Sequence, residues 1–569
     1  MFKIFKIFLI VYFFNITPSY SLNKQFLNLE DTHLKYLLGS VSLEENDALK
    51  AYSYLNEIKE LGEEHQNFNI NFIRTLVELE KFGELFSFLN KQKNTLNFYD
   101  ANLLLGLDSL VKKNYKDSEK FFEKLKFLKK SNYHDSILEE LISNVMLGWL
   151  EASKQNKDEA LRYFSQMPGN LNTLNLIQKT FAACYFEDQE TETYFENLVL
   201  NSDRQFSRYY FFLSNYLLRK GLNEKAEKKI DEGIKQNNQN LLLNQTKEFF
   251  IKKDYKKIKN YFDCKNTKHQ ISEFFYLIAN FYILDEDYIR SNFYLKLSNY
   301  FNKNFKLNKV LIAENYLKIK NYEISKNTYY SLKKIGQKTS WHSDKKISDI
   351  ISNTENTQKS IIFIENAFKK LKSKNYVHFL EVGDIYKKNK IYEKSIEYYS
   401  NAIKLLPENH SLLPKILDRR GTSYERMGEW ERADNDLELS LQFNPDQAYV
   451  LNYLAYSWLE RKVNIEKSLK MLVKANSLYK NDPFIMDSLA WAMYLLNDFE
   501  ESEKILKKVV QMMPSDPIVN DHYAEVLCKQ KKYLQARYAW SYVLGLPTTE
   551  EKLKKEIQKK IIYCHDKSL

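Results

Sequence analysis

Small residues recur at a fixed interval inside the apolar stretches of the last third of the sequence. They stand at Gly383, Gly421, Ala455, Ala490 and Ala524, which are separated by 38, 34, 35 and 34 residues. A period of this length predicts an array of repeats in which each unit packs on the next. The repeating unit is therefore about 34 residues long.

The residues that follow each small residue also repeat. A bulky apolar or aromatic residue usually comes three positions later, a second small residue twelve positions later and a large residue sixteen positions later. In the second unit these residues are Tyr424, Ala433 and Leu437, and Gly428 falls where a turn is expected. Two helices pack closely only where a residue without a large side chain stands at their crossing. The spacing therefore predicts one antiparallel helix pair in each unit.

The same spacing continues toward the N-terminus, with further units around Ala313 and Gly106. It predicts about 12 to 15 repeats, from about residue 28 to residue 548. The match is weakest over residues 68–100, 244–266 and 341–374, where the small residues are missing from the expected places. We expect a hinge or an altered helix packing in these segments.

The pattern resembles the tetratricopeptide repeat, with its Leu-Gly, Tyr, Ala, Phe and Pro positions, in five consecutive units. The resemblance implies an all-α fold, a right-handed superhelical solenoid of antiparallel helix pairs in which each repeat contacts chiefly its neighbours. The motifs Leu-Ala-Tyr-Ser at residues 454–457 and Asp-Ser-Leu-Ala-Trp at residues 487–491 are similar to those of exported tetratricopeptide proteins of alphaproteobacteria.

The end of the sequence predicts a capping helix. Thr548 and Glu551 form a capping-box signature, and Leu553, Ile557 and Ile561 recur every four residues between charged residues. One apolar stripe on a charged helix is suited to cover the open face of the last repeat. The predicted division is a signal peptide (1–21), divergent repeats (22–375), five well-matched repeats (376–548) and a capping helix with a tail (549–569).

The N-terminus has the three-part layout of a secretory signal. Lys3 and Lys6 precede an apolar run over residues 7–14, and small residues such as Ser21 follow it. The apolar run is much shorter than the roughly 20 residues that a membrane-spanning helix needs, so a cleaved signal is favoured over an anchor. With the resemblance, this predicts cleavage after Ser21 and a location in the periplasm or envelope of a Gram-negative bacterium.

Composition supports long helices. Only 13 Gly and 9 Pro occur in 569 residues, too few for the many turns of a β-sandwich or for the phosphate loops of an α/β enzyme. The net charge of +11 comes from 85 basic and 74 acidic residues spread along the whole chain. The lysine runs indicate solvated helix faces, so we expect no nucleic-acid partner.

The cysteines and histidines form no motif. Cys184, Cys264, Cys528 and Cys564 lie far apart without CxxC spacing, which indicates neither a zinc site nor a disulfide framework. A bridge between Cys528 and Cys564 is conceivable in an oxidising compartment, but packed or free thiols are favoured. His522 is interpreted as a surface or groove residue rather than as a general base.

No motif of an enzyme is present, and the repeats leave no interval for a separate catalytic domain. We therefore expect a non-catalytic scaffold that binds other proteins, without a catalytic residue, cofactor or metal, and that serves the assembly or maintenance of the envelope. Two alternatives stay open. One is a repeat-bearing subunit of an enzyme complex, such as an accessory of a glycosyltransferase or protease, and the other is a membrane-anchored assembly factor.

The resemblance also implies where a partner binds. In similar repeats the first helix of each pair lines the concave face, through residues six and three before the small residue and one and four after it. Aromatic and acidic residues at these positions would favour segments with apolar anchors and nearby Lys or Arg. Equally open is that Phe484, Trp491 and Tyr494 pack between neighbouring repeats. The predicted groove residues are Tyr449, Asn452, Tyr456, Phe484, Asp487, Trp491, Tyr494, Asp521 and Glu525, with Leu459, Ile518 and Cys528 at the remaining positions.

Overall fold

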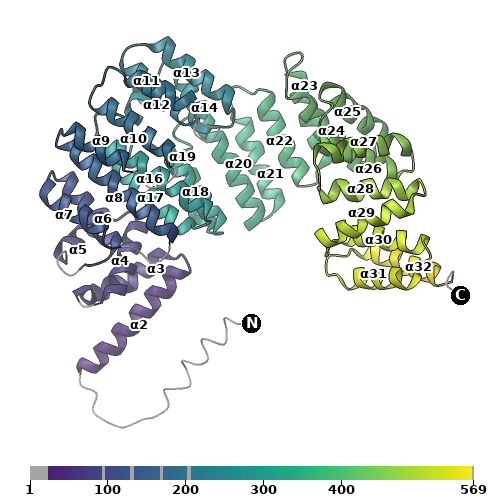
Figure 1. Cartoon of the computed structure of the whole chain (residues 1–569), viewed down its shortest axis with the longest axis horizontal. Coiled ribbons are helices and arrows are strands. Elements are labelled where there is room, and N and C mark those ends of the chain that lie inside the picture. The colour runs from purple at the N-terminus through teal and green to yellow at the C-terminus, as the bar shows by residue number, and fades with distance from the viewer. Residues whose placement is uncertain are drawn as a thin grey trace, which may run out of the picture. The chain divides into compact units, whose positions relative to one another are not determined.

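The computed structural model of the chain describes residues 24–63, 65–92, 96–128, 133–166, 171–200 and 207–566. The predicted signal peptide lies outside these residues. Within them the chain forms 31 α-helices and no strand, which confirms the all-helical prediction (Figure 1). The chain divides into two compact units, unit 1 up to Asn356 and unit 2 from Thr357. This division falls inside one of the three segments that match the repeat pattern poorly.

Unit 1 consists of stacked helix pairs joined by short turns. Its helices are α2 (Lys24–Glu44), α3 (Ala48–Leu55), η1 (Asn56–Glu63), α4 (Gln66–Glu78), α5 (Phe82–Lys91), α6 (Tyr99–Val111), α7 (Tyr115–Leu125), α8 (Tyr133–Ser153), α9 (Lys157–Ser165), α10 (Asn172–Tyr185), α11 (Thr191–Leu200), α12 (Tyr209–Arg219), α13 (Asn223–Gln236), α14 (Leu241–Ile251), α15 (Tyr255–Tyr261), α16 (Thr267–Leu284), α17 (Tyr288–Phe301), η3 (Lys306–Asn308), α18 (Lys309–Lys318), α19 (Tyr322–Leu332) and α20 (Gln337–Thr354).

Unit 2 continues with the same kind of helix pair and ends in a single helix. Its helices are α21 (Thr357–Lys369), α22 (Tyr376–Lys388), α23 (Tyr392–Lys404), α24 (Leu413–Arg426), α25 (Trp430–Phe443), α26 (Ala448–Glu460), α27 (Ile465–Leu478), α28 (Pro483–Leu495), α29 (Phe499–Met512), α30 (Pro517–Lys529), α31 (Tyr533–Gly545) and α32 (Glu551–Asp566).

The small residue of each repeat lies where the two helices of that repeat cross. A Cβ placed on Gly383 would lie 2.6 Å from the Tyr399 ring, and a Cβ on Gly421 would lie 2.9 Å from Cγ of Leu437. In both of these repeats the large residue follows the glycine by sixteen positions, as the sequence pattern predicts. The same approach occurs at Gly39 and Leu55, Gly106 and Phe122, and Gly148 and Phe164.

The second small residue of the unit also joins the two helices when it is serine. The Ser502 hydroxyl donates a hydrogen bond of 2.8 Å to the Ala490 carbonyl, twelve residues before it, and both residues are fully buried. Because a buried hydroxyl without a partner costs free energy, this bond explains why serine is tolerated at the crossing. Matching bonds run from Ser118 to Gly106 and from Ser325 to Ala313.

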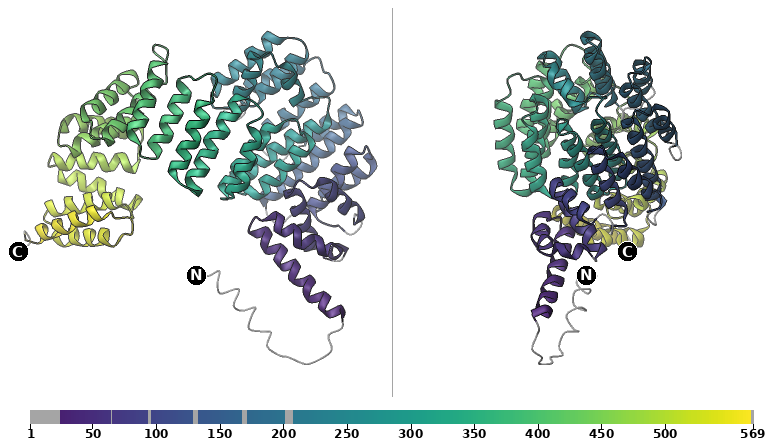
Figure 2. Two further views of the ribbon diagram at one scale, coloured as in Figure 1. Left: turned by 180° about the vertical axis from the view of Figure 1, so that it is seen from behind. Right: turned by 90° about the vertical axis from the view of Figure 1, so that its left-hand side faces the viewer.

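Unit 1 closes back on itself, which the repeat pattern did not predict. Helix α4 packs on α17, α8 on α16, and α14 on α20, although these partners are far apart in the sequence. In Figure 2 the purple and blue N-terminal helices of unit 1 accordingly lie beside its teal helices. Its buried side chains form one continuous core from Leu43 to Tyr316. Each repeat still contacts chiefly its neighbours, as expected, but in unit 1 some N-terminal helices also contact helices that come several repeats later in the sequence.

A buried polar cluster joins the two ends of this closure. The Lys296 ammonium lies 2.8 Å from the Glu78 carboxylate and donates to the Tyr316 hydroxyl at 2.6 Å. The Tyr316 hydroxyl in turn donates to Glu78. Burial alone would raise the pKa of Glu78, but the charge of Lys296 and these hydrogen bonds lower the pKa below its ordinary value. Helices α4, α17 and α18 are thus held together by an ionised pair.

The segment around α15 has the altered packing that its poor match predicted. Helix α15 has only seven residues, and its neighbour α14 contacts α20 as well as adjacent helices. The Glu248 carboxylate accepts the backbone N–H groups of Gln337 and Lys338 at the start of α20, at 3.1 and 3.0 Å. An anion at a helix N-terminus is favourable, so Glu248 caps α20 from outside the helix.

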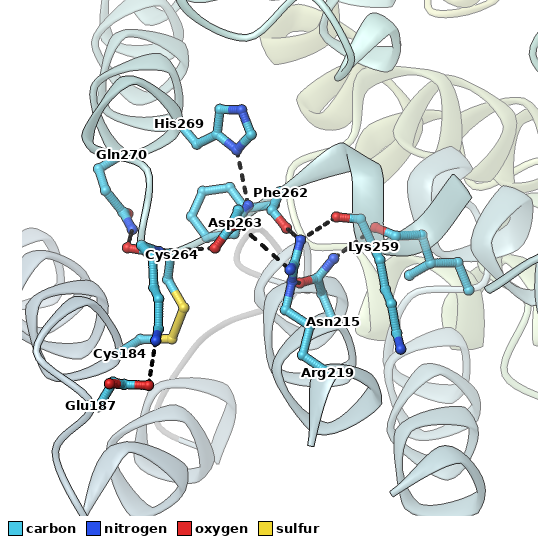
Figure 3. A network of polar contacts seen from close by, with 12 residues as sticks. Cys184, Glu187, Asn215, Arg219, Lys259, Phe262, Asp263, Cys264, His269 and Gln270 are labelled. Carbon is cyan, nitrogen blue, oxygen red and sulfur yellow. Dashed lines mark hydrogen bonds and ion pairs between the residues drawn. A yellow bond between two sulfur atoms is a disulfide. The ribbon is translucent and has the colours of Figure 1, made fainter. Parts of the chain in front are cut away.

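A disulfide fixes the loop that follows α15. Cys264 in this loop is bonded to Cys184 of α10, with the two Cα atoms 5.8 Å apart (Figure 3). Arg219 of α12 donates to the Phe262 carbonyl at 2.7 Å, and Gln270 donates to the Cys264 carbonyl at 2.7 Å. The loop therefore gains from side chains the hydrogen bonds that a longer helix would have supplied.

Unit 2 is an array of separate small cores. Each helix packs mainly on the next one or two helices, and the buried apolar residues fall into several clusters. Helix α32 covers the last pair, with Ile557 fully buried against Trp540, which confirms the predicted capping helix. A second disulfide joins Cys564 of α32 to Cys528 of α30.

The sequence prediction of packed or free thiols is wrong for all four cysteines. Each of them is in a disulfide, and the Cα separations of 5.8 and 6.1 Å are within the usual range for such bonds. The prediction failed because spacing along a sequence does not show which cysteines meet when helices of different repeats pack.

Replacing Gly421 by Leu should lower the stability of unit 2 by about 1–3 kcal/mol, because the new side chain overlaps Leu437 and pushes the helices apart. Thermal and denaturant unfolding would measure the change. The control is Gly545→Leu at the exposed end of α31, where a Cβ meets nothing within 4 Å. Equal stability of the two variants would contradict the proposed crossing.

Replacing Lys296 by Ala should cost about 3–5 kcal/mol, because it leaves the Glu78 carboxylate buried without its partner. The lowered pKa of Glu78 means that the pair stabilises the fold above the unfolded-state pKa, and that this contribution is lost as the pH falls through the folded-state pKa. Urea unfolding at several acidic pH values should show that the difference in the free energy of unfolding between wild type and variant becomes smaller as the pH falls. Lys309→Ala, which breaks a more exposed pair with Glu80, should cost at most about 1 kcal/mol.

Candidate functional site

A groove with a volume of about 560 Å³ opens on the first helices of successive pairs in unit 2. Helices α24, α26, α28 and α30 contribute most of its walls. A cavity of this size is within the range of protein sites that take a ligand or a few side chains. Its lining residues are Glu425, Arg426, Trp430, Asn452, Tyr453, Tyr456, Ser457, Glu460, Arg461, Phe484, Asp487, Ser488, Asp516, Ile518 and Val519.

Three apolar side chains stand exposed at the second position of their helices. We call Tyr449 of α26, Phe484 of α28 and Ile518 of α30 the apolar ladder. They are 56, 58 and 43% exposed, and the last two line the groove. Asp482 and Asp516 fix the starts of α28 and α30, because each carboxylate accepts two backbone N–H groups of the first turn. Strong helix starts therefore hold the ladder in place.

Asp487 does not offer a free carboxylate to the groove. Its two oxygens lie 2.9 and 3.1 Å from Nδ1 of His522, and both residues are buried. Burial alone would lower the pKa of His522, but the Asp487 charge and hydrogen bond raise it above its ordinary value. His522 is thus a buried partner of Asp487 that does not line the groove, and its interpretation as a surface or groove residue is wrong.

Trp491 and Tyr494 form an aromatic stack with His522. The Trp491 ring lies 4.1 Å from the His522 ring and 4.6 Å from the Tyr494 ring, nearly parallel to both. Tyr494 is buried and its hydroxyl donates to Glu525 at 2.9 Å. The structure therefore places Trp491 and Tyr494 between repeats, as the alternative interpretation had it, whereas Phe484 is exposed.

The groove residues predicted on α30 are bonded to other residues of the same chain. Asp521 accepts from the Trp540 indole and from the Lys560 ammonium, each at 2.7 Å. Lys560 of α32 also pairs with Glu525. Because Cys528 is bonded to Cys564, three residues of α30 hold the capping helix. Asp521 was expected to line the groove, but it is buried.

Sequence reasoning missed several lining residues, including Trp430, Tyr453 and Arg461. Arg426 and Glu460 both stand five positions after the small residue of their units, one position beyond the rule that was applied. Adding this position would have found them. Asn452 and Tyr456, which the rule selected, do line the groove, and partner binding by any of these residues stays a prediction.

Unit 1 has an apolar cavity of about 520 Å³, in which Arg208 is the main charged group. The Arg208 guanidinium is already held by Glu273 through two hydrogen bonds of 2.8 Å and lies 3.9 Å from the Tyr276 ring. These contacts give Arg208 a structural role. The groove of unit 2, with exposed apolar residues beside charged ones, is the better candidate for a binding site.

A curated relative is also described as a repeat protein of this kind. A TPR repeat-containing protein of Pseudomonas aeruginosa is 26% identical over 126 residues, which are 22% of this chain and 21% of the relative. The resemblance to tetratricopeptide-repeat proteins is confirmed. The matched part spans only about a fifth of that relative's own length. No family model matches the chain.

Solved structures with tetratricopeptide-type repeats are similar in part. A tetratricopeptide repeat protein from Parabacteroides merdae has 18% identity and a TM-score of 0.34, covering 40% of this chain and 87% of its own. An APC/C hetero-tetramer has 12% identity and a TM-score of 0.31, covering 81% of this chain and 96% of its own. The particular resemblance to alphaproteobacterial proteins stays a prediction.

The pair between His522 and Asp487 should make the stability of unit 2 depend on pH. Because the pKa of His522 is raised, the pair stabilises the fold fully below the unfolded-state pKa of about 6.5, and the contribution is lost as the pH rises through the folded-state pKa. The difference in melting temperature between wild type and His522→Gln should therefore shrink at alkaline pH. All other histidines are present in both proteins, so their contributions to the pH dependence cancel in this difference. A difference that grows with pH would contradict a charged pair.

Proposed function

We propose that the chain is a scaffold that holds other proteins, and that the groove of unit 2 binds a segment of such a partner. The observation that carries the proposal is the apolar ladder, which is exposed beside charged side chains on a rigid array of helices. Exposed apolar groups rimmed by polar ones mark interaction sites, and stacked repeats present extended surfaces of this kind. The tetratricopeptide-type fold supports the proposal that the partners are proteins.

The scaffold works in the cell envelope after export through a cleaved signal. The two disulfides support this location, because disulfides persist in oxidising compartments and are rare in reducing ones. None of the described helices has the length and apolar character needed to cross a membrane. A subunit of an enzyme complex would use the same groove, and a membrane-anchored factor would differ only at its N-terminus.

Photo-crosslinking in native cells tests the groove. A photoreactive residue in place of Ile518 should give covalent adducts with partner proteins, and these should disappear when Phe484→Ser is added. The control position is Leu534 on α31, which is 63% exposed but does not line the groove. Adducts of equal amount and identity from both positions would contradict the proposed binding site.

Mass spectrometry of the native protein tests export. We expect a mature N-terminus at Leu22 and no thiol that reacts with an alkylating reagent before reduction. A retained Met1, or four reactive thiols in the native protein, would contradict the proposed location.

A further inference from the structure

The apolar ladder has a regular step. Tyr449, Phe484 and Ile518 are 35 and 34 residues apart and occupy the same position of α26, α28 and α30. These three helices pack side by side in order. Since packed helices lie about 8–10 Å apart, each step of the ladder is on the order of 10 Å.

This step matches one conformation of a bound segment well. A polyproline II helix has three residues per turn and advances about 9.3 Å in one turn, so every third side chain lies on the same face. A β-strand places side chains of one face only about 6.6 Å apart, which does not fit the step. A polyproline II segment therefore presents one side chain to each member of the ladder.

An α-helix also repeats on one face at a similar distance, since seven residues advance about 10.5 Å. A helical segment is therefore the alternative occupant, and the peptide test below distinguishes it from an extended one. The groove offers about 560 Å³, which side chains of a bound segment can fill.

The charge of the groove favours a basic segment. Its walls carry four carboxylates, Glu425, Glu460, Asp487 and Asp516, against the guanidinium groups of two arginines. One of these arginines, Arg461, is paired with Asp434 outside the groove at 2.7 Å. His522 balances Asp487, so the excess acid comes mainly from Glu460 and Asp516, in a chain whose net charge is +11. The acidic walls are therefore a local feature and do not follow from composition.

We propose that the groove of unit 2 binds a polyproline II segment with an apolar side chain or proline at every third residue and Lys or Arg between them. The proposal rests on the proposed function, since it names the chemistry of the partner segment that the scaffold holds. Phe484 and Ile518 receive apolar side chains inside the groove and Tyr449 receives one outside it, whereas Glu460 and Asp516 attract the basic side chains.

Synthetic peptides and the full chain test this inference by fluorescence anisotropy. The first peptide has about ten residues, with Leu at every third position and Pro and Lys between. The second has the same composition with the leucines adjacent, the third has Glu in place of Lys, and the fourth is a helix-forming peptide with Leu at every seventh position. The first peptide should bind at least tenfold more tightly than each of the others.

Matched variants locate the binding. Phe484→Ser should weaken the first peptide about tenfold or more, whereas Tyr538→Ser, at a 70% exposed residue of α31, should not change its affinity. Glu460→Lys should weaken the binding of the Lys peptide and reduce the preference of the groove for this peptide over the Glu peptide. Glu556→Lys makes the same charge change at an exposed residue of α32 outside the groove and should have no such effect.

Three results would overturn the inference. They are tighter binding of the helical peptide, equal binding of the first two peptides, and no binding of any peptide while crosslinks from position 518 persist. In each case the proposed function stands, because crosslinking reports a partner of any conformation. Loss of the crosslinks themselves would overturn the proposed function instead.

Discussion

The contact between a small residue and the large residue sixteen positions later sets the geometry of every repeat in which it occurs. Gly106 with Phe122 in unit 1 and Gly383 with Tyr399 in unit 2 leave no room for even one added carbon atom. This contact fixes how closely the two helices of one repeat approach each other. The members of the apolar ladder occupy the same position in successive repeats, so their spacing follows from how these repeats stack.

The same local contact leads to two different organisations. In unit 2 the repeats stack in line, and their buried apolar residues form several small clusters that neighbouring repeats share. In unit 1 the turn is closed, and Glu78 meets Lys296 across more than two hundred residues of sequence. The additional surface buried by closure makes one continuous core. Around the short α15 the packing differs as well, because α14 packs on α20 in addition to its sequence neighbours α13 and α15.

The sequence predicted what depends on local spacing. It located the helix pairs, the turn at Gly428, the serine and glycine at the crossings and the final capping helix, because each follows from residues within one repeat. It did not predict the closure of unit 1 or the two disulfides, since these join residues of different repeats. A pattern with a period of one repeat holds no information about contacts several repeats apart.

The candidate site also depends on contacts between repeats, which the sequence pattern did not predict. The positional rule identified the inner face of α26, α28 and α30, but it could not show that Asp487 and Asp521 face other side chains. These buried carboxylates bind His522, Trp540 and the partly exposed Lys560. Networks of hydrogen bonds among buried groups rigidify a structure, so these contacts hold the first helices in place. A rigid inner face allows the exposed ladder to bind without an additional cost of ordering its own backbone.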